Sequence, residues 1–72
     1  MSARNILKQG REHAIQTGQH WVHVKGMLYV TIWCTGCRRT EYFIATPSHP
    51  RLTKISLSKA RKMLSWGLQH PD

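Results

Sequence analysis

The chain has 72 residues, and Lys and Arg outnumber Asp and Glu by 11 to 3, so the formal net charge is +8 at pH 7. A chain this short buries too little surface to support two cores, and we expect a single domain over residues 1–72. A charge of this size repels itself in the folded state and therefore favours a polyanionic partner. DNA or RNA is the first candidate and an acidic protein surface the second; a basic domain whose charge serves only solubility is the alternative.

The composition also argues against membrane insertion and against catalysis. No stretch is apolar and long enough to span a bilayer, and the N-terminus lacks the pattern of a signal peptide, so we expect a cytoplasmic protein without membrane contact. Glu12 and Glu41 stand on separate predicted elements with no acidic companion, and the chain has no glycine-rich phosphate loop. We therefore expect a binding protein and not an enzyme.

The first predicted element is an amphipathic N-terminal helix. Ser2 is a suitable N-cap, apolar residues recur at helical spacing between Ala3 and Ala14, and Gly18 is a natural stop. Gly10 in the middle costs about 1 kcal/mol relative to alanine. Its presence predicts either a weak helix or a close approach to another backbone.

Residues 21–45 predict a three-stranded antiparallel meander. Three runs of alternating side chains are separated by Lys25-Gly26 and by Cys34-Thr35-Gly36-Cys37, both of which suit tight turns. Because side chains alternate with period two, we expect one aliphatic face covered by a helix and one mixed face. The aliphatic face is predicted to hold Val22, Val24, Leu28, Val30, Ile32 and Ile44, and the mixed face Trp21, His23, Tyr29, Thr31, Trp33, Arg39, Glu41 and Phe43.

The C-terminal part predicts a proline-containing loop followed by a second helix. Pro47 and Pro50 mark the loop, and residues 51–54 are expected to be irregular. Ser56 is the predicted N-cap of a helix with apolar residues at helical spacing, and Gly67 followed by Pro71 predicts its end. The expected fold class is α+β, with the order α-β-β-β-α.

The Cys34-x-x-Cys37 motif has three interpretations. With His20 and His23 it could form a two-His, two-Cys zinc site, which would help so small a domain to fold. The two cysteines could instead form a disulfide or a redox pair, or remain reduced beside a hairpin turn that needs no metal. The reduced pair is the preferred interpretation, and we expect no cofactor.

The mixed face is the preferred binding surface. Aromatic rings beside cationic side chains supply stacking surfaces next to phosphate-directed charge. For the rings themselves, a second core under the N-terminal helix is favoured over exposure, because so large a bare apolar patch is unusual. The predicted binding residues are Trp21, Lys25, Tyr29, Trp33, Arg38, Arg39, Arg51, Lys54, Lys59 and Lys62.

Residues 21–68 resemble, at the level of pattern, two families of DNA-binding domain. Three predicted antiparallel strands followed by a helix that begins Ser-Leu-Ser-Lys-Ala-Arg resemble the arm-type domains of phage integrases and the plant ethylene-response type of domain. That resemblance implies a sheet that enters the major groove of DNA and a helix that supports it. The chain departs from both families at the CTGC turn, at the proline loop and in its N-terminal helix.

In size and charge the chain is also similar to small bacteriophage proteins that regulate host machinery. This second resemblance implies a regulatory protein that acts on a host partner, such as RNA polymerase or a defence complex.

Overall fold

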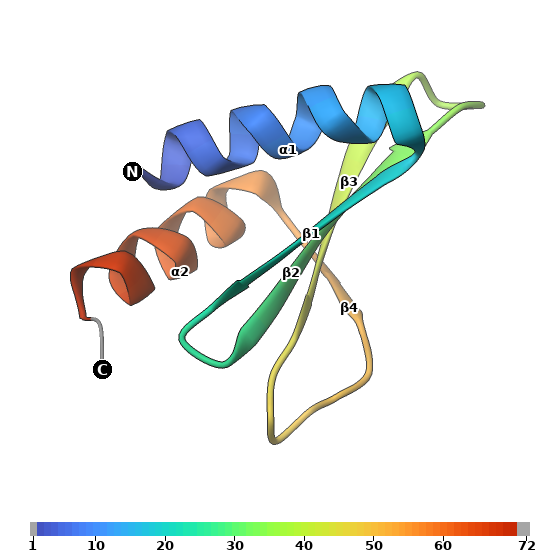
Figure 1. Cartoon of the computed structure of the whole chain (residues 1–72). Helices are drawn as coiled ribbons and strands as arrows, with labels where there is room; N and C mark the ends of the chain where they lie inside the picture. Colours follow the sequence, from blue (N-terminus) through green and yellow to red (C-terminus); the bar gives the residue numbers. More distant parts are fainter. Residues whose placement is uncertain (1, 71–72) are drawn as a thin grey trace.

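The computed structural model describes residues 2–70, and in this part of the chain it shows two helices and four strands. In chain order they are α1 (Ala3–Thr17), β1 (Gln19–Val24), β2 (Met27–Cys34), β3 (Arg39–Ala45), β4 (Thr53–Ile55) and α2 (Leu57–Gln69). The strands form one antiparallel sheet in the order β1-β2-β3-β4, and both helices pack on the same side of it (Figure 1). The predicted α+β class is confirmed, with one strand more than expected.

Both helices begin where the sequence predicted. The Ser2 hydroxyl accepts a hydrogen bond from the backbone N–H of Asn5 (3.2 Å), and the Ser56 hydroxyl accepts one from Lys59 (3.1 Å). Each serine thereby satisfies a backbone donor that has no partner within the helix. Helix α1 ends at Gly18, whose φ of 99° favours glycine.

The predicted end of α2 at Gly67 is wrong, because the helix continues through this residue to Gln69. Gly67 is buried, and a Cβ atom there would lie only 3.1 Å from Cγ1 of Val24. The missing side chain therefore lets the helix approach β1 closely. This glycine serves packing and not helix termination.

The extra strand comes from the segment that was predicted to be irregular. In β4, Ile55 pairs with Tyr42 and Thr53 pairs with Ile44. A three-residue strand is too short to show an alternating pattern, so its signal is absent from the local sequence. Ile55 is 9% exposed and joins the core, which fixes the strand at the edge of the sheet.

The predicted composition of the two sheet faces is wrong, and the first hairpin explains why. Lys25 and Gly26 form its two-residue turn with positive φ values of 53° and 79°, so that Val24 lies directly opposite Met27. Residues that lie opposite each other in the ladder point to the same face. Met27 and Tyr29 therefore share a face with Val22 and Val24, and Leu28 points to the other face. The prediction had shifted β2 by one residue relative to β1.

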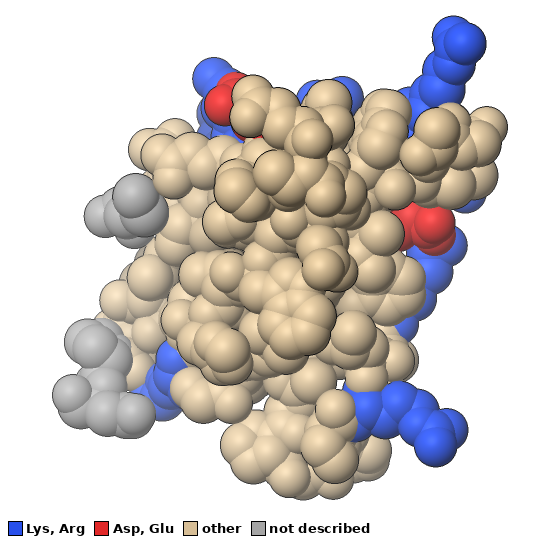
Figure 2. Space-filling model, turned by 45° about the vertical axis from the view of Figure 1, so that its right-hand side comes forward, with Lys and Arg blue, Asp and Glu red and all other residues tan. Residues whose placement is uncertain are grey.

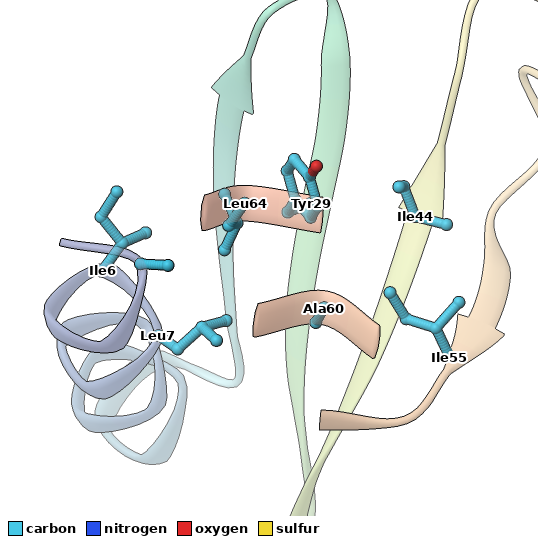
Figure 3. Packing of buried hydrophobic residues seen from close by; sticks show 8 residues of the cluster. Ile6, Leu7, Tyr29, Ile44, Ile55, Ala60 and Leu64 are labelled. Atoms are coloured by element: carbon cyan, nitrogen blue, oxygen red, sulfur yellow. The ribbon is translucent and has the colours of Figure 1, made fainter. Parts of the chain in front are cut away.

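The same register continues into β3. Tyr29 lies between Val22 and Ile44, and this row faces the helices. Figure 3 shows Leu64 of α2 beside Tyr29 and Leu7 of α1 extending toward α2; Ile6 belongs to the same buried cluster. The buried cluster consists of Ala3, Ile6, Leu7, Tyr29, Ile44, Ile55, Ala60 and Leu64.

Gly10 lies close to the sheet, but its nearest neighbours are side chains and not the other backbone that was predicted. A Cβ atom at this position would lie 3.0 Å from Cδ2 of His20 and 3.4 Å from Oγ1 of Thr31. The neighbours are thus side chains of β1 and β2. The glycine allows the helix to lie directly on the sheet.

Neither helix covers the opposite side of the sheet, which we call the open sheet face. Its central row runs from Trp21 through Val30 to Phe43. Trp21 is 54% exposed, whereas Val30 is only 1% exposed although no helix covers it. Figure 2, which turns this side of the sheet forward, shows a broad area without Lys or Arg and blue side chains at its edges. The pairing places Trp21, His23, Leu28, Val30, Ile32 and Phe43 on this face, with Arg39, Glu41 and Lys54 at its β3–β4 side.

Candidate functional site: a basic groove

A groove lies where α1, the start of α2, β3 and β4 meet, and its volume is about 1040 Å³. Its lining combines apolar residues from both helices, such as Leu7 and Leu57, with a large number of cationic side chains. We call it the basic groove. The cations that line it are Arg4, Lys8, Arg11, Arg38, Arg39, Lys54 and Arg61.

Helix α1 supplies three of these cations from one stripe. Arg4, Lys8 and Arg11 are spaced by four and three residues, so they lie above one another along the helix. The stripe adjoins Leu7, which packs in the core. Burial of the apolar face of α1 therefore directs this flank toward the groove.

The turn between β2 and β3 and the first residue of β3 supply two more cations. Residues 35–38 form the turn, and Arg38 has a φ of 53°, a conformation that reverses the chain before β3 begins. Arg39 then pairs with Cys34 at the end of the β2–β3 ladder. Both arginines are exposed and line the groove opposite α1.

Glu41 is the one carboxylate among the groove residues. Its carboxylate contacts Nζ of Lys54 at 2.5 Å. The hydrogen bond and the charge of Lys54, assisted by Arg39, hold the pKa of Glu41 below its usual value. Glu41 is therefore ionised at neutral pH, and it neutralises one of the seven cations.

The structure brings together only part of the predicted set of binding residues. Arg38, Arg39 and Lys54 line the basic groove. Lys59 and Lys62 are exposed on α2 but do not line it, and neither does Arg51, which lies in the β3–β4 loop. The cations on α2 thus divide between two sides of the helix.

Four groove residues were missed by the predicted set: Arg4, Lys8, Arg11 and Arg61. The spacing of the three cations on α1 was a signal that could have identified them, because it predicts one continuous stripe. Whether this stripe would line a binding surface depended on which side of α1 packs against β3 and α2. Arg61 carried no comparable signal beside Lys59 and Lys62.

The predicted aromatic residues do not form one surface. Tyr29 is 4% exposed, its burial raises the pKa of the phenol, and its hydroxyl lies 4.0 Å from Sδ of Met27. It therefore belongs to the core and not to an exposed face. Trp33 is half-buried on the helix side, and Trp21 is exposed on the open sheet face. Neither tryptophan lines the basic groove.

Lys25 is also distant from the basic groove. Its ammonium lies 4.7 Å from the centre of the Trp66 ring and donates a hydrogen bond to the backbone carbonyl of His70. The Trp66 ring in turn stacks on His70 with ring centres 4.4 Å apart. These contacts attach the tip of the first hairpin to the C-terminal end of α2, where a cation is favoured by the helix dipole.

The proposed zinc ligands do not converge. His20 faces the helices, with its ring 5.0 Å from that of His13, while His23 lies on the open sheet face, opposite Leu28. Cys34 is at the far end of β2 from Leu28, six residues along, which corresponds to roughly 20 Å. Within residues 2–70 no group of three or more metal-ligating side chains is suitably placed for an ion.

No family model matches the chain, and comparisons with curated proteins and with solved structures returned no significant match. Neither of the two helices in the described part of the chain is long and apolar enough to cross a membrane. The geometry of the basic groove is therefore the main guide to function.

Proposed function

We propose that this protein is a non-enzymatic regulatory protein that binds the phosphate backbone of DNA or RNA in the basic groove. The observation that supports this proposal is the convergence of seven cations from four segments on one concave surface, with a single carboxylate among them. Polyanion binding relieves the mutual repulsion of these cations and releases counterions from the nucleic acid. Phosphate contacts of this kind set affinity and orientation and carry no direct information on base sequence.

A salt titration of two charge-matched variants tests the proposal. The double variant R11Q/R61Q removes two groove cations, and K59Q/K62Q removes two exposed cations that do not line the groove. For a B-DNA duplex, we expect the slope of log K against log salt to become shallower by about 2 in the groove variant and to change much less in the control. With the six groove cations other than the paired Lys54 in contact with phosphates, the wild-type slope would be about −5.

Three outcomes contradict the proposal: no measurable affinity at low salt, an affinity that salt does not change, or equal weakening in both variants. Parallel titrations with duplex RNA and single strands identify the preferred form. A-form RNA and single strands present their phosphates in a different geometry from B-DNA.

The open sheet face supports a second candidate function, which is docking on an acidic surface of another protein. An apolar centre that contains an exposed tryptophan, with Lys and Arg around it, has the composition of a protein interface (Figure 2). The complementary partner would present an apolar patch bordered by Asp and Glu. A regulator or inhibitor of a host enzyme is the form this function would take.

The two functions are separated by variants on opposite sides of the molecule. If docking is correct, a partner with such an acidic surface is captured after nuclease treatment, is lost with W21A and is retained by R11Q/R61Q. Capture that disappears on nuclease treatment, or that W21A leaves unchanged, would contradict docking by the open sheet face.

A further inference from the structure

The CTGC turn lies at the border of the basic groove and has no part in the function proposed above. Cys34 is the last residue of β2 and Cys37 lies in the turn that follows, directly before Arg38 and Arg39. Cys34 is half-buried, Cys37 is exposed, and both thiols are free. Arg39, which lines the groove, is the cation whose charge acts on both thiols.

The two cysteines contact each other in an asymmetric way. The thiol of Cys37 and then its backbone N–H donate hydrogen bonds to the sulfur of Cys34, and they lower the pKa of Cys34. Burial and the charge of Glu41 oppose this shift, and Arg39 adds a smaller lowering effect. The same thiol contact raises the pKa of Cys37. Cys34 is thus the sulfur that ionises first, and Cys37 is the second thiol placed beside it. This arrangement is typical of a reactive Cys-x-x-Cys pair.

The backbone of the turn is compatible with a covalent bond between the two. Residues at positions i and i+3 of a β-turn have Cα atoms less than about 7 Å apart, and disulfides usually need about 4.4–6.8 Å. Thiols already within hydrogen-bonding contact require only a small movement to meet. Gly36 in the turn has no neighbouring atom within 4 Å of its Cβ position, so the turn has room to adjust.

We propose that Cys34 and Cys37 form a redox-active dithiol that exchanges with low-molecular-weight disulfides, and that closure of the Cys34–Cys37 bond strengthens polyanion binding in the basic groove. The first part of this inference, the thiol–disulfide exchange, concerns only the turn. The regulatory half rests on the function proposed for the groove.

The exchange proceeds in two balanced steps. The Cys34 thiolate attacks one sulfur of a small disulfide such as oxidised glutathione, forms a mixed disulfide and releases one thiolate. Cys37 then loses its proton and attacks the Cys34 sulfur, which closes the Cys34–Cys37 bond and releases the second thiolate. The two cysteines lose two electrons and two protons in total, and the small disulfide becomes two thiols.

The effect on the groove follows from the charge beside Arg39. When the Cys34 thiol of the reduced protein loses its proton, the negative sulfur attracts Arg39, its neighbour across the β2–β3 ladder, and competes with phosphate for this side chain. The disulfide carries no charge, so oxidation removes the competitor. One additional phosphate contact increases the affinity by up to about tenfold near 0.1 M salt.

The test begins without nucleic acid. The wild-type protein is equilibrated with mixtures of reduced and oxidised glutathione, quenched by alkylation and weighed by mass spectrometry. We expect an internal disulfide, seen as the loss of two hydrogen atoms, whereas C37S accumulates one glutathionyl group on Cys34 and C34S reacts more slowly at neutral pH. Absence of the internal disulfide at every glutathione ratio would overturn the proposal.

The second measurement compares nucleic-acid affinity of the reduced and oxidised protein at about pH 8, where Cys34 ionises more fully. We expect a lower Kd for the oxidised form, and a Kd for C34S that does not depend on redox conditions. An equal or higher Kd for the oxidised form would overturn the regulatory half. If the disulfide forms but neither state binds nucleic acid, the function proposed for the groove fails while the dithiol chemistry stands.

Discussion

Replacement of Glu41 by glutamine tests the electrostatics of the basic groove most directly. Glu41 contacts Lys54 at 2.5 Å and is the only carboxylate among the groove residues. Glutamine keeps nearly the same shape and removes the charge, so Lys54 is released from its ion pair. We therefore expect E41Q to bind a polyanion more tightly than the wild-type protein, an uncommon direction for a substitution in a binding site.

The magnitude follows from one additional phosphate contact. If the released Lys54 reaches a phosphate, the slope of log K against log salt becomes steeper by about 0.9, which corresponds to about eightfold tighter binding at 0.1 M salt. A matched control is E12Q. It removes the same charge from a residue of α1 that does not line the groove. Glu12 lies one helical turn from Lys8, within the roughly 10 Å over which charges act at this salt concentration, so E12Q measures the effect of removing a nearby negative charge without releasing Lys54.

The assay is fluorescence anisotropy with one labelled duplex at four or more salt concentrations, with circular dichroism to show that each variant is folded. Equal affinities for E41Q and E12Q would refute the reasoning, because the gain would then reflect net charge and not the groove. Weaker binding by E41Q would show that the Glu41–Lys54 pair itself holds the site in its binding geometry.

Three further predictions concern stability, measured by urea unfolding. Leu64 is fully buried, so L64A should lose about 2.7–5 kcal/mol. G18A should lose about 1–2 kcal/mol because Gly18 has a φ of 99°, whereas G36A should resemble the wild-type protein, since Gly36 has neither a positive φ nor a crowded Cβ position. Burial and then the charge of His13 lower the pKa of His20 below 6.5. The folded state thus resists protonation, so stability present above pH 6.5 is lost as pH falls toward the lower folded pKa. H20Q should show a smaller loss between about pH 7.5 and about pH 5.5, and an unchanged loss would contradict this assignment.

Local chemistry accounts for the features that were predicted correctly. The hydroxyls of Ser2 and Ser56 cap helices because each satisfies donors within its own first turn, and Gly18 ends α1 because of its own backbone conformation. The Lys25-Gly26 turn likewise depends on two adjacent residues. Such signals involve contacts between near neighbours in the chain, which is why they are readable without the fold.

Which residues share a face of the sheet depends on the strand register across the first hairpin turn. The turn was identified correctly, but a two-residue turn places Val24 and Met27 on the same face, and this places Tyr29 in the core. A shift of one residue exchanges every side chain of β2 between the faces. The exposed aromatic surface that had been expected is reduced by this register to Trp21 and its neighbours on the open sheet face.

The sequence by itself determined the charge, the two capped helices, the first hairpin turn and a sheet rich in aromatic residues. Only the tertiary structure decided that both helices cover one face, that Thr53–Ile55 adds a fourth strand, and that the cations of α1 meet Arg38, Arg39 and Arg61 around one groove. These cations are distant in the chain, and nothing in one segment specifies the orientation of another. Their arrangement follows from the burial of Leu7, Tyr29 and Leu64 in a shared core, which fixes the flanks of both helices relative to β3 and β4.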